Sequence, residues 1–224
     1  MRNKLILMLL LIIFSMSLST PVQASLGNLL LKVGSTGADV VELQTKLNDL
    51  GFKVGKVDGI FGSTTKQGVI SFQLTHSLVG DGIVGPLTVK SLNQAYLGIQ
   101  RQKKLDSVLA TAKKYLGVQY QWGGCIPATG FDCSGFVSYV FGYNGVVLPR
   151  ISIDQYTVGT KVSFEDLQPG DLIFFSFTGD GVVNHVGIYL GAGQFINAST
   201  SKGVTVYVIG PYWKSVYVGA RRVF

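Results

Sequence analysis

The spacing of hydrophobic residues changes character near the middle of the chain. In the first half, Val40, Leu43 and Leu47 recur at three- and four-residue intervals, which is typical of an amphipathic helix. Asp39 is placed to cap the start of this helix, and Gly51 stands where it should stop. The full pattern predicts three short helices, at about residues 38–50, 63–78 and 86–96.

A sequence repeat separates these helices. The pattern Asp-Gly-Ile-x-Gly-x-x-Thr starts at Asp58 and again at Asp81, a period of 23 residues. Each Asp-Gly pair favours a tight turn, because the carboxylate can accept a bond from the backbone ahead and glycine tolerates positive φ. The residues that follow, beginning at Ser63 and Pro86, are typical of a helix start. The repeat therefore predicts two similar loops.

After Gly117 the pattern becomes typical of strands, with short β-branched and aromatic runs bounded by Gly, Pro or Asp. The predicted strands are residues 172–176, 185–190, 194–198, 204–209 and 216–220. Ahead of them, residues 133–141 have helical character, and Asp132 is placed to cap that helix. We therefore predict an α+β fold class: a small all-α three-helix domain, then a domain in which the helix that bears Cys133 packs on an antiparallel sheet.

Composition narrows the functional classes. A chain of 224 residues, 47% hydrophobic and 14% charged, can form one large or two small domains, and wholesale disorder is excluded. Two cysteines do not make a disulfide scaffold. Two histidines beside two cysteines argue against a zinc enzyme, and we expect no metal or organic cofactor.

The first residues predict export. Arg2 and Lys4 precede an apolar run over residues 5–14, and small residues end at Ala24, which together are typical of a secretory signal cleaved after Ala24. The alternative is a membrane anchor, but the run is well short of the ~20 residues that a spanning helix needs. We therefore expect an exported protein with no membrane span after cleavage.

The net charge of +7 is unevenly distributed. Within residues 99–117, one acidic residue, Asp106, stands against five basic ones: Arg101, Lys103, Lys104, Lys113 and Lys114. A solvated connector or helix face is the simpler explanation, and attraction to an anionic wall or membrane surface is the alternative. We expect no nucleic-acid partner, because no aromatic residues interleave with the basic ones.

Candidate chemistry lies in the second half. A cysteine at a helix N-terminus, as predicted for Cys133, is favoured as a thiolate by the peptide dipoles. His185 is the one histidine available there as a base. If the predicted hairpin pairs Gly187 with Asn197, then His185 and Asn197 share a face, whereas a one-residue slip separates them. Each of these residues also has a purely structural alternative.

The first half resembles the three-helix peptidoglycan-binding domain of bacterial and phage wall hydrolases. The resemblance covers about residues 30–96 and rests on the repeat, on the Leu43-Gln44 pair and on the Phe72-Gln73 pair. It implies non-catalytic attachment to cell-wall polymer. A helical spacer without a ligand is the alternative.

The second half resembles the NlpC-type papain-like endopeptidases of bacterial cell walls, over about residues 105–224. The resemblance rests on five motifs in order: GVQYQWGG (117–124), FDCSGFV (131–137), LPRIS with Gln155 (148–155), LQPGDLIFF (167–175) and NHVGIYLG (184–191). It implies Cys133 as nucleophile, His185 as general base and Asn197 as the orienting third residue, a position where this family often has histidine. It also implies that Tyr120 lies near the nucleophile and assists with the oxyanion or the substrate.

The same resemblance implies a substrate, the stem peptide of peptidoglycan, cut between γ-D-glutamate and the diamino acid. Asp132 is then suited to pair with the N-terminal amine of L-alanine, with Ser134 donating nearby, and helix capping is its alternative role. Arg150 is suited to a bidentate contact with a carboxylate, and a surface salt bridge is its alternative. Ser152 follows as a polar neighbour in the substrate-binding set.

Together these features and the two resemblances predict a secreted, monomeric hydrolase of the bacterial cell wall whose partner is peptidoglycan. Its parts are a signal peptide (1–24), a peptidoglycan-binding domain (25–98), a basic linker or first helix of the catalytic domain (99–117), and the peptidase domain (118–224). Alternatives are an amidase or acyltransferase on another wall or lipid substrate, and a non-catalytic wall-binding protein. Cys125 is expected to be an incidental thiol, although a disulfide with Cys133 would sequester the nucleophile.

Overall fold

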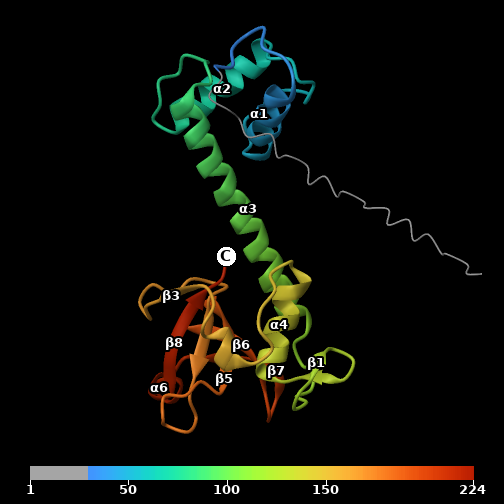
Figure 1. The fold of residues 1–224 in the computed structure, drawn as a ribbon, viewed down its shortest axis with the longest axis vertical. Coiled ribbons are helices and arrows are strands. Elements are labelled where there is room, and N and C mark those ends of the chain that lie inside the picture. Colours follow the sequence, from blue (N-terminus) through green and yellow to red (C-terminus); the bar gives the residue numbers. More distant parts are fainter. Residues whose placement is uncertain (1–29) are drawn as a thin grey trace, which may run out of the picture. The chain divides into compact units, whose positions relative to one another are not determined.

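The computed structural model describes residues 30–224, so the signal peptide predicted at residues 1–24 lies outside the described part of the chain. The structure divides into two compact units, with the boundary between Gln94 and Ala95. The first unit is helical and the second combines helices with an antiparallel sheet (Figure 1). The predicted fold class, a helical region followed by an α+β domain, is confirmed.

The helical unit contains α1 (Ala38–Asp49), α2 (Ser63–Thr75) and the beginning of α3 (Pro86–Lys114). Its helices bury the predicted apolar stripe, including Val40, Leu43 and Leu47. The cap predicted at Asp39 is wrong. The N-cap is Gly37, whose φ of 110° favours glycine, and Asp39 lies inside the first turn, where a negative charge favours the helix dipole.

Two buried glutamines, Gln44 and Gln73, hold the repeated loops in the same way. Each donates through Nε2 to the aspartate and to the threonine of its own repeat, and each accepts through Oε1 from the glycine after that aspartate. The Nε2 bonds join Gln44 to Asp58 and Thr65 (3.0 and 3.1 Å) and Gln73 to Asp81 and Thr88 (3.0 and 3.1 Å). In each loop, which has no regular secondary structure, the buried glutamine amide thus supplies the hydrogen bonds that hold the backbone and side chains in place.

The third helix is longer than predicted. The sequence predicts a helix over 86–96 and a separate basic stretch, but α3 continues from Pro86 to Lys114. The basic residues therefore lie on a helix, and Lys113 and Lys114 occupy its last turn, where positive charge is favourable. Gly98 alone does not break the helix, because one glycine costs about 1 kcal/mol relative to alanine.

The α+β unit is built on a six-stranded antiparallel sheet. The strand order is β3-β8-β4-β5-β6-β7, and each pair is antiparallel. The strands are β3 (Thr160–Val162), β4 (Leu172–Phe175), β5 (His185–Gly191), β6 (Gln194–Ser199), β7 (Gly203–Val208) and β8 (Tyr217–Arg222). A separate two-stranded sheet pairs β1 (Cys125–Ile126) with β2 (Gly130–Phe131). The remaining helices are α4 (Cys133–Tyr143), α5 (Ser152–Gln155) and α6 (Pro211–Ser215).

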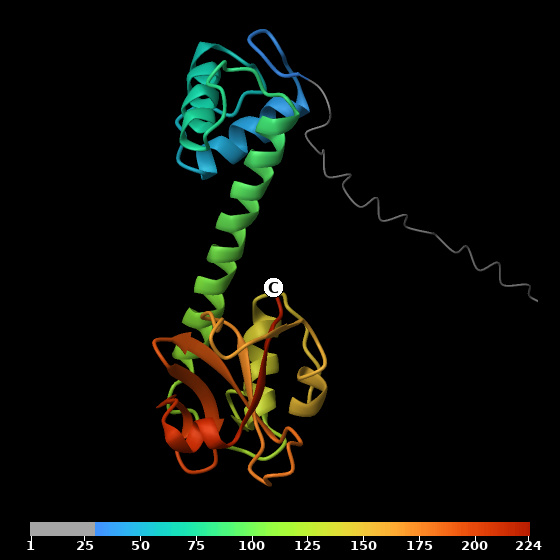
Figure 2. The same ribbon diagram turned by 90° about the vertical axis from the view of Figure 1, so that its left-hand side faces the viewer.

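The two faces of the sheet are buried against different elements. Along β4, Leu172 and Phe174 join the core that contains the α4 residue Phe136, whereas Phe175 joins a second core that contains Trp213 of α6. This alternation follows the two-residue period of a strand. Figures 1 and 2 show α4 and α6 beside the sheet, with α4 beginning near one end of β5. That end carries the candidate site.

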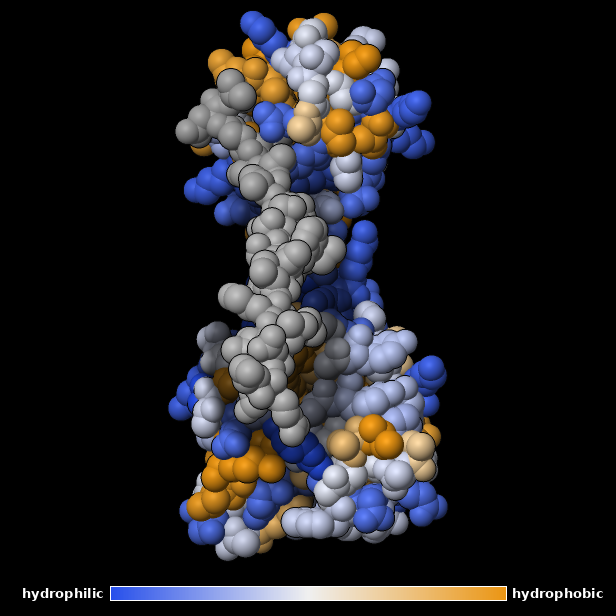
Figure 3. Space-filling model, turned by 45° about the vertical axis from the view of Figure 1, so that its right-hand side comes forward, coloured by the Kyte–Doolittle hydropathy of each residue, from blue (hydrophilic) through white to orange (hydrophobic). Residues whose placement is uncertain are grey.

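Within residues 30–224, no helix combines the length and the apolar character that crossing a bilayer requires. Figure 3 shows hydrophobic residues exposed in small groups among hydrophilic ones on the visible face of each unit. Single exposed apolar residues are common on protein surfaces and by themselves indicate no partner.

Candidate active site

Cys133 is the first residue of α4, as the sequence predicts. The helix is capped by Asp132, whose Oδ1 accepts from the backbone N–H of Gly135 at 2.7 Å. Only 9% of Cys133 is exposed. Burial raises the pKa of its thiol, the negative charge of Asp132 adds to this, and a hydrogen bond from the Val186 backbone opposes it. The helix N-terminus therefore does not by itself produce a resting thiolate, because desolvation outweighs it.

His185 and Asn197 are joined across the β5–β6 hairpin. Ile188 pairs with Ile196, and the same register carried back along the hairpin aligns Gly187 with Asn197, the alignment that places His185 and Asn197 on one face. His185 Nε2 lies 3.0 Å from Asn197 Oδ1, and the Asn197 side chain is fully buried. Because the amide oxygen only accepts, this bond places the imidazole proton on Nε2 and leaves Nδ1 as the basic nitrogen.

Burial also controls the charge of the imidazole. Desolvation lowers the pKa of His185 to about 4, against a smaller opposing effect of the bond to Asn197, which stabilises the charged ring. At neutral pH the site therefore pairs a neutral imidazole with a protonated thiol. Proton transfer from Cys133 then has to accompany attack on a substrate, which is general-base catalysis.

One cleft of about 580 Å³ brings the predicted residues together. It is lined by all of the predicted site residues except Arg150: Tyr120, Asp132, Cys133, Ser134, Ser152, His185 and Asn197. Burial and then the nearby charges of Cys133 and Asp132 raise the pKa of Tyr120, so its hydroxyl stays a hydrogen-bond donor beside the nucleophile. The arrangement offers a nucleophile, an oriented base and a donor for a developing oxyanion.

Comparison with known proteins matches both halves of the chain to family models. Residues 117–222 match the NlpC/P60 family, and residues 36–92 match a peptidoglycan binding domain. The chain belongs to the NlpC/P60 family. The NlpC/P60 domain contains every residue of the cleft described above.

Individual relatives agree with this family. The chain is 42% identical over 159 residues to the gamma-DL-glutamyl hydrolase of Bacillus subtilis (strain 168), covering 67% of this chain and 38% of that protein. It is 50% identical over 116 residues to the "Probable endopeptidase p60" of Listeria seeligeri, covering 52% of this chain and 22% of that protein. The chain thus spans well under half the length of these curated relatives.

A solved structure shows the same likeness. An NlpC/P60 family protein from Bacillus cereus ATCC 10987 superimposes with a TM-score of 0.50 at 39% identity. The match covers 53% of this chain and 39% of that one.

Within the NlpC/P60 domain, Asp132 and Arg150 pair with each other. The sequence suggests a substrate amine for Asp132 and a substrate carboxylate for Arg150, but Arg150 Nη1 and Nη2 donate to the two Asp132 oxygens at 2.9 and 2.7 Å. Arg150 also reaches Ser134 Oγ and the Gly124 carbonyl. Although burial opposes it, the bond from Arg150 and that from Gly135 lower the pKa of Asp132. The two parallel bonds make this a bidentate, charge-assisted pair, which is stronger than a hydrogen bond between neutral groups.

The loop that carries Arg150 is fastened to the first turns of α4. Gln155 is fully buried, and its Nε2 donates to the Ser134 carbonyl at 3.1 Å, to Ser138 Oγ at 2.9 Å and to the Pro149 carbonyl at 2.8 Å. Ser152, between Arg150 and Gln155 in the sequence, is the first residue of α5 and lines the cleft. The sequence motif identified these residues, and the structure shows that Gln155 positions the loop.

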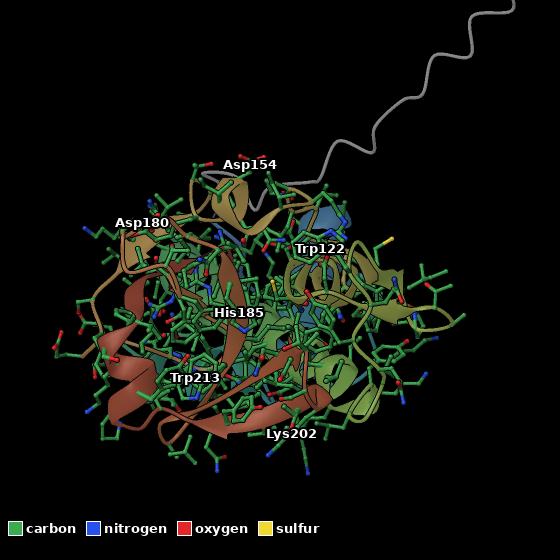
Figure 4. The ribbon with its side chains drawn as sticks, turned by 90° about the horizontal axis from the view of Figure 1, so that it is seen from below. Trp122, Asp154, Asp180, His185, Lys202 and Trp213 are labelled. Atoms are coloured by element: carbon green, nitrogen blue, oxygen red, sulfur yellow. The ribbon has the colours of Figure 1, made fainter. Side chains whose placement is uncertain are left out.

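Sequence reasoning missed the aromatic surroundings of His185. The ring of Trp213 stacks on the imidazole at 6.0 Å between centroids and 28° between planes, and Phe177 lies 5.1 Å away. Both residues line the cleft. In Figure 4, His185 lies between Trp213 on one side and Trp122 on the other. The aromatic composition of α6 was the only sequence signal, and its place beside the histidine depends on tertiary structure.

Both cysteines are free thiols. Cys125 is exposed on β1, and Cys133 is buried at the cleft. The structure therefore holds the two without the disulfide that would sequester the candidate nucleophile.

Proposed function

We propose that this chain is an exported peptidoglycan hydrolase, a cysteine endopeptidase that cleaves the stem peptide between γ-D-glutamate and the diamino acid. The observation that carries the proposal is the bond between His185 and the buried Asn197, in the same cleft as Cys133 at the start of α4. Names of relatives support the substrate class, since one is a gamma-DL-glutamyl hydrolase and another an endopeptidase.

The reaction begins with attack by sulfur on the γ-glutamyl carbonyl carbon. His185 Nδ1 accepts the thiol proton as the C–S bond forms, and the carbonyl electrons move to oxygen. The backbone N–H of Cys133 and the Tyr120 hydroxyl are the donors for this oxyanion. Collapse of the intermediate breaks the C–N bond, and the imidazolium gives its proton to the departing amine.

Hydrolysis of the thioester completes the cycle. Neutral His185 accepts a proton from water, hydroxide adds to the thioester carbon, and the C–S bond breaks. The imidazolium then returns a proton to the thiolate, so the enzyme is regenerated. Asn197 holds the ring in one tautomer throughout, the role of the third member in Cys-His-polar triads.

The helical unit supplies attachment to the wall in this proposal. The match of residues 36–92 to a peptidoglycan binding domain supports this attachment. The relatives that act on peptidoglycan suggest a cell-wall or extracellular location. Export by the signal predicted at residues 1–24 belongs to the same proposal.

The test is mass spectrometry of purified peptidoglycan digested with the chain or with Cys133→Ala. New products ending in γ-D-glutamate, absent with the variant, are expected. Release of intact stems from the glycan would instead identify an amidase, and a mass increase on the stem would identify an acyltransferase. Binding of both proteins to the wall without any product would identify a non-catalytic binder.

A further inference from the structure

Three aromatic rings surround the imidazole of His185, and they are held in different ways. Phe175 is a buried residue of β4, and Trp213 packs against it in the second core, at 4.8 Å between ring centroids. Phe177 lies 5.1 Å from the imidazole, but it belongs to the loop between β4 and β5, residues 176–184, and 48% of it is exposed. Its position on His185 therefore depends on how that loop is held.

One carboxylate oxygen holds the first part of the loop. Asp180 Oδ1 accepts from Thr178 Oγ1 at 2.7 Å and from the Val182 backbone N–H at 2.9 Å. The same oxygen accepts from Ser176 Oγ at 3.0 Å. Ser176 is buried, and its own N–H donates to the Val216 carbonyl at 2.8 Å. Three bonds to one oxygen thus close the loop and tie it to a buried residue at the end of the sheet.

Asn184, the residue before the histidine, holds the backbone of Phe177. Its Oδ1 accepts from the Phe177 N–H at 3.0 Å, and its Nδ2 donates to Thr178 Oγ1 at 3.3 Å. Thr178 in turn donates to Asp180, so a continuous chain of hydrogen bonds joins Asp180 to the residue that precedes His185. The backbone of Phe177 is therefore fixed from both sides.

Asp180 does not itself reach the reacting groups. Within residues 30–224, the lining of the cleft includes Phe177 and not Asp180, and Figure 4 shows Asp180 apart from His185. The bonds from Thr178 and from the Val182 N–H lower the pKa of the Asp180 carboxyl, so this group stays an ionised acceptor at neutral pH. An effect of Asp180 on the histidine therefore passes through the loop.

We propose that Asp180 is a positioning residue of this site: by holding the loop, it keeps Phe177 over the imidazole of His185 and excludes water from the general base. The inference rests on the proposed function, because it concerns the base of that reaction. Burial is the main influence on the protonation of this ring, so a loosened loop should make the imidazole easier to protonate.

The other ionisable groups around His185 do not depend on the loop. Those that line the cleft with it, on four segments of the described chain, are Tyr120, Asp132, Cys133, Tyr207 and Tyr212. Asp132 is paired with Arg150, and thiols and phenols are neutral over the range in which an imidazole titrates. The neighbouring lysines, Lys202 and Lys214, lie over the rings of Tyr207 and Phe164. On β4 and β6 the neighbours are the uncharged Phe175 and Asn197.

The test is a nuclear magnetic resonance titration of the full chain, which measures the protonation of His185 without any substrate. In Asp180→Ala the midpoint should rise from about pH 4 by about 1–2 pH units, because water reaches the ring. Loss of a negative charge alone would shift the midpoint in the opposite direction. His76, in the helical unit, should titrate as in the wild type and is the internal control. An unchanged or lowered midpoint for His185 would overturn the inference.

Two variants separate the bonds of Asp180 from its charge. Asp180→Asn is neutral but keeps an Oδ1 acceptor for the loop, so its midpoint should lie close to that of the wild type. Asp154→Ala removes an exposed carboxylate from α5, which lies apart from His185 in Figure 4, and is the matched control that should cause no shift. A rise in Asp180→Asn as large as that in Asp180→Ala would refute the role given to the bonds.

Phe177→Ala tests the route from the loop to the histidine. It should reproduce the rise, and the double variant with Asp180→Ala should rise no further, because the aspartate acts through this ring. Additive shifts would contradict that route.

Kinetics then connects the titration with catalysis. The acid limb of kcat/KM on a stem peptide should move upward with the midpoint in Asp180→Ala and stay in place in Asp154→Ala. An acid limb that stayed in place in Asp180→Ala would deny the loop a role in the reaction. Absence of cleavage by the wild-type chain would instead remove the proposed function, and the titration would still decide whether the loop keeps water from the imidazole.

Discussion

The bond between His185 Nε2 and Asn197 Oδ1, 3.0 Å long and buried, determines which imidazole nitrogen can act as a base. Asn197→Ala should lower kcat about 10–100-fold, because the ring loses its tautomer and its orientation. Asn197→His restores an acceptor and should recover most of the rate. Steady-state kinetics on a stem peptide measures both. Equal activity in Asn197→Ala and the wild type would show that the bond has no role in catalysis.

A substitution at Cys133 should abolish hydrolysis of peptidoglycan without changing attachment to it. Cys133→Ala removes the nucleophile and should abolish cleavage, while binding to insoluble peptidoglycan stays at the wild-type level because the helical unit is untouched. Co-sedimentation with purified wall measures binding, and product mass measures cleavage. Loss of binding in Cys133→Ala would place attachment in the cleft instead of in the helical unit.

The rate should persist to unusually low pH. His185 acts as a base only when neutral, and burial lowers its pKa to about 4, so kcat/KM should fall below about pH 4 and not near 6.5. The bond that His185 donates to Asn197 raises this pKa, so Asn197→Ala should move the acid limb to still lower pH. The pH profile of kcat/KM with a soluble stem peptide measures the acid limb of the wild type and that of the Asn197→Ala variant. An acid limb near 6.5 in the wild type would mean that the imidazole is solvated.

The sequence predicted the elements that carry chemistry better than their surroundings. The helix start at Cys133 and the hairpin that joins His185 to Asn197 follow from local patterns, namely a cap and a two-residue alternation. The stacking of Trp213 depends on where α6 crosses the sheet, which no local pattern encodes. The pairing of Asp132 with Arg150 likewise joins residues 18 apart that each had a plausible substrate role.

In the helical unit, the repeat predicted two similar loops but not what holds them. Gln73 is buried and donates to Asp81, Ile83 and Thr88. Gln73→Ala should destabilise this unit by about 2–3 kcal/mol, since it leaves buried polar partners unsatisfied. Gln67→Ala, at an exposed position of α2 in the same unit, is the control. Far-UV circular dichroism should show an earlier helical transition, while tryptophan fluorescence stays unchanged because Trp122 and Trp213 both lie in the α+β unit. A shift in fluorescence alone would contradict this assignment.

The buried imidazole should make the α+β unit sensitive to acid. In the unfolded chain His185 binds a proton below about pH 6.5, but in the folded chain only below about pH 4. Between these values the unfolded state binds more protons, so the free energy of unfolding should fall as pH decreases from 6.5 to 4, by about 3 kcal/mol, and then level off. Urea unfolding followed by tryptophan fluorescence measures this change. His185→Gln lacks the titrating group and should lose that part of the pH dependence. If both proteins lost stability in parallel over this range, the acid sensitivity would come from other groups.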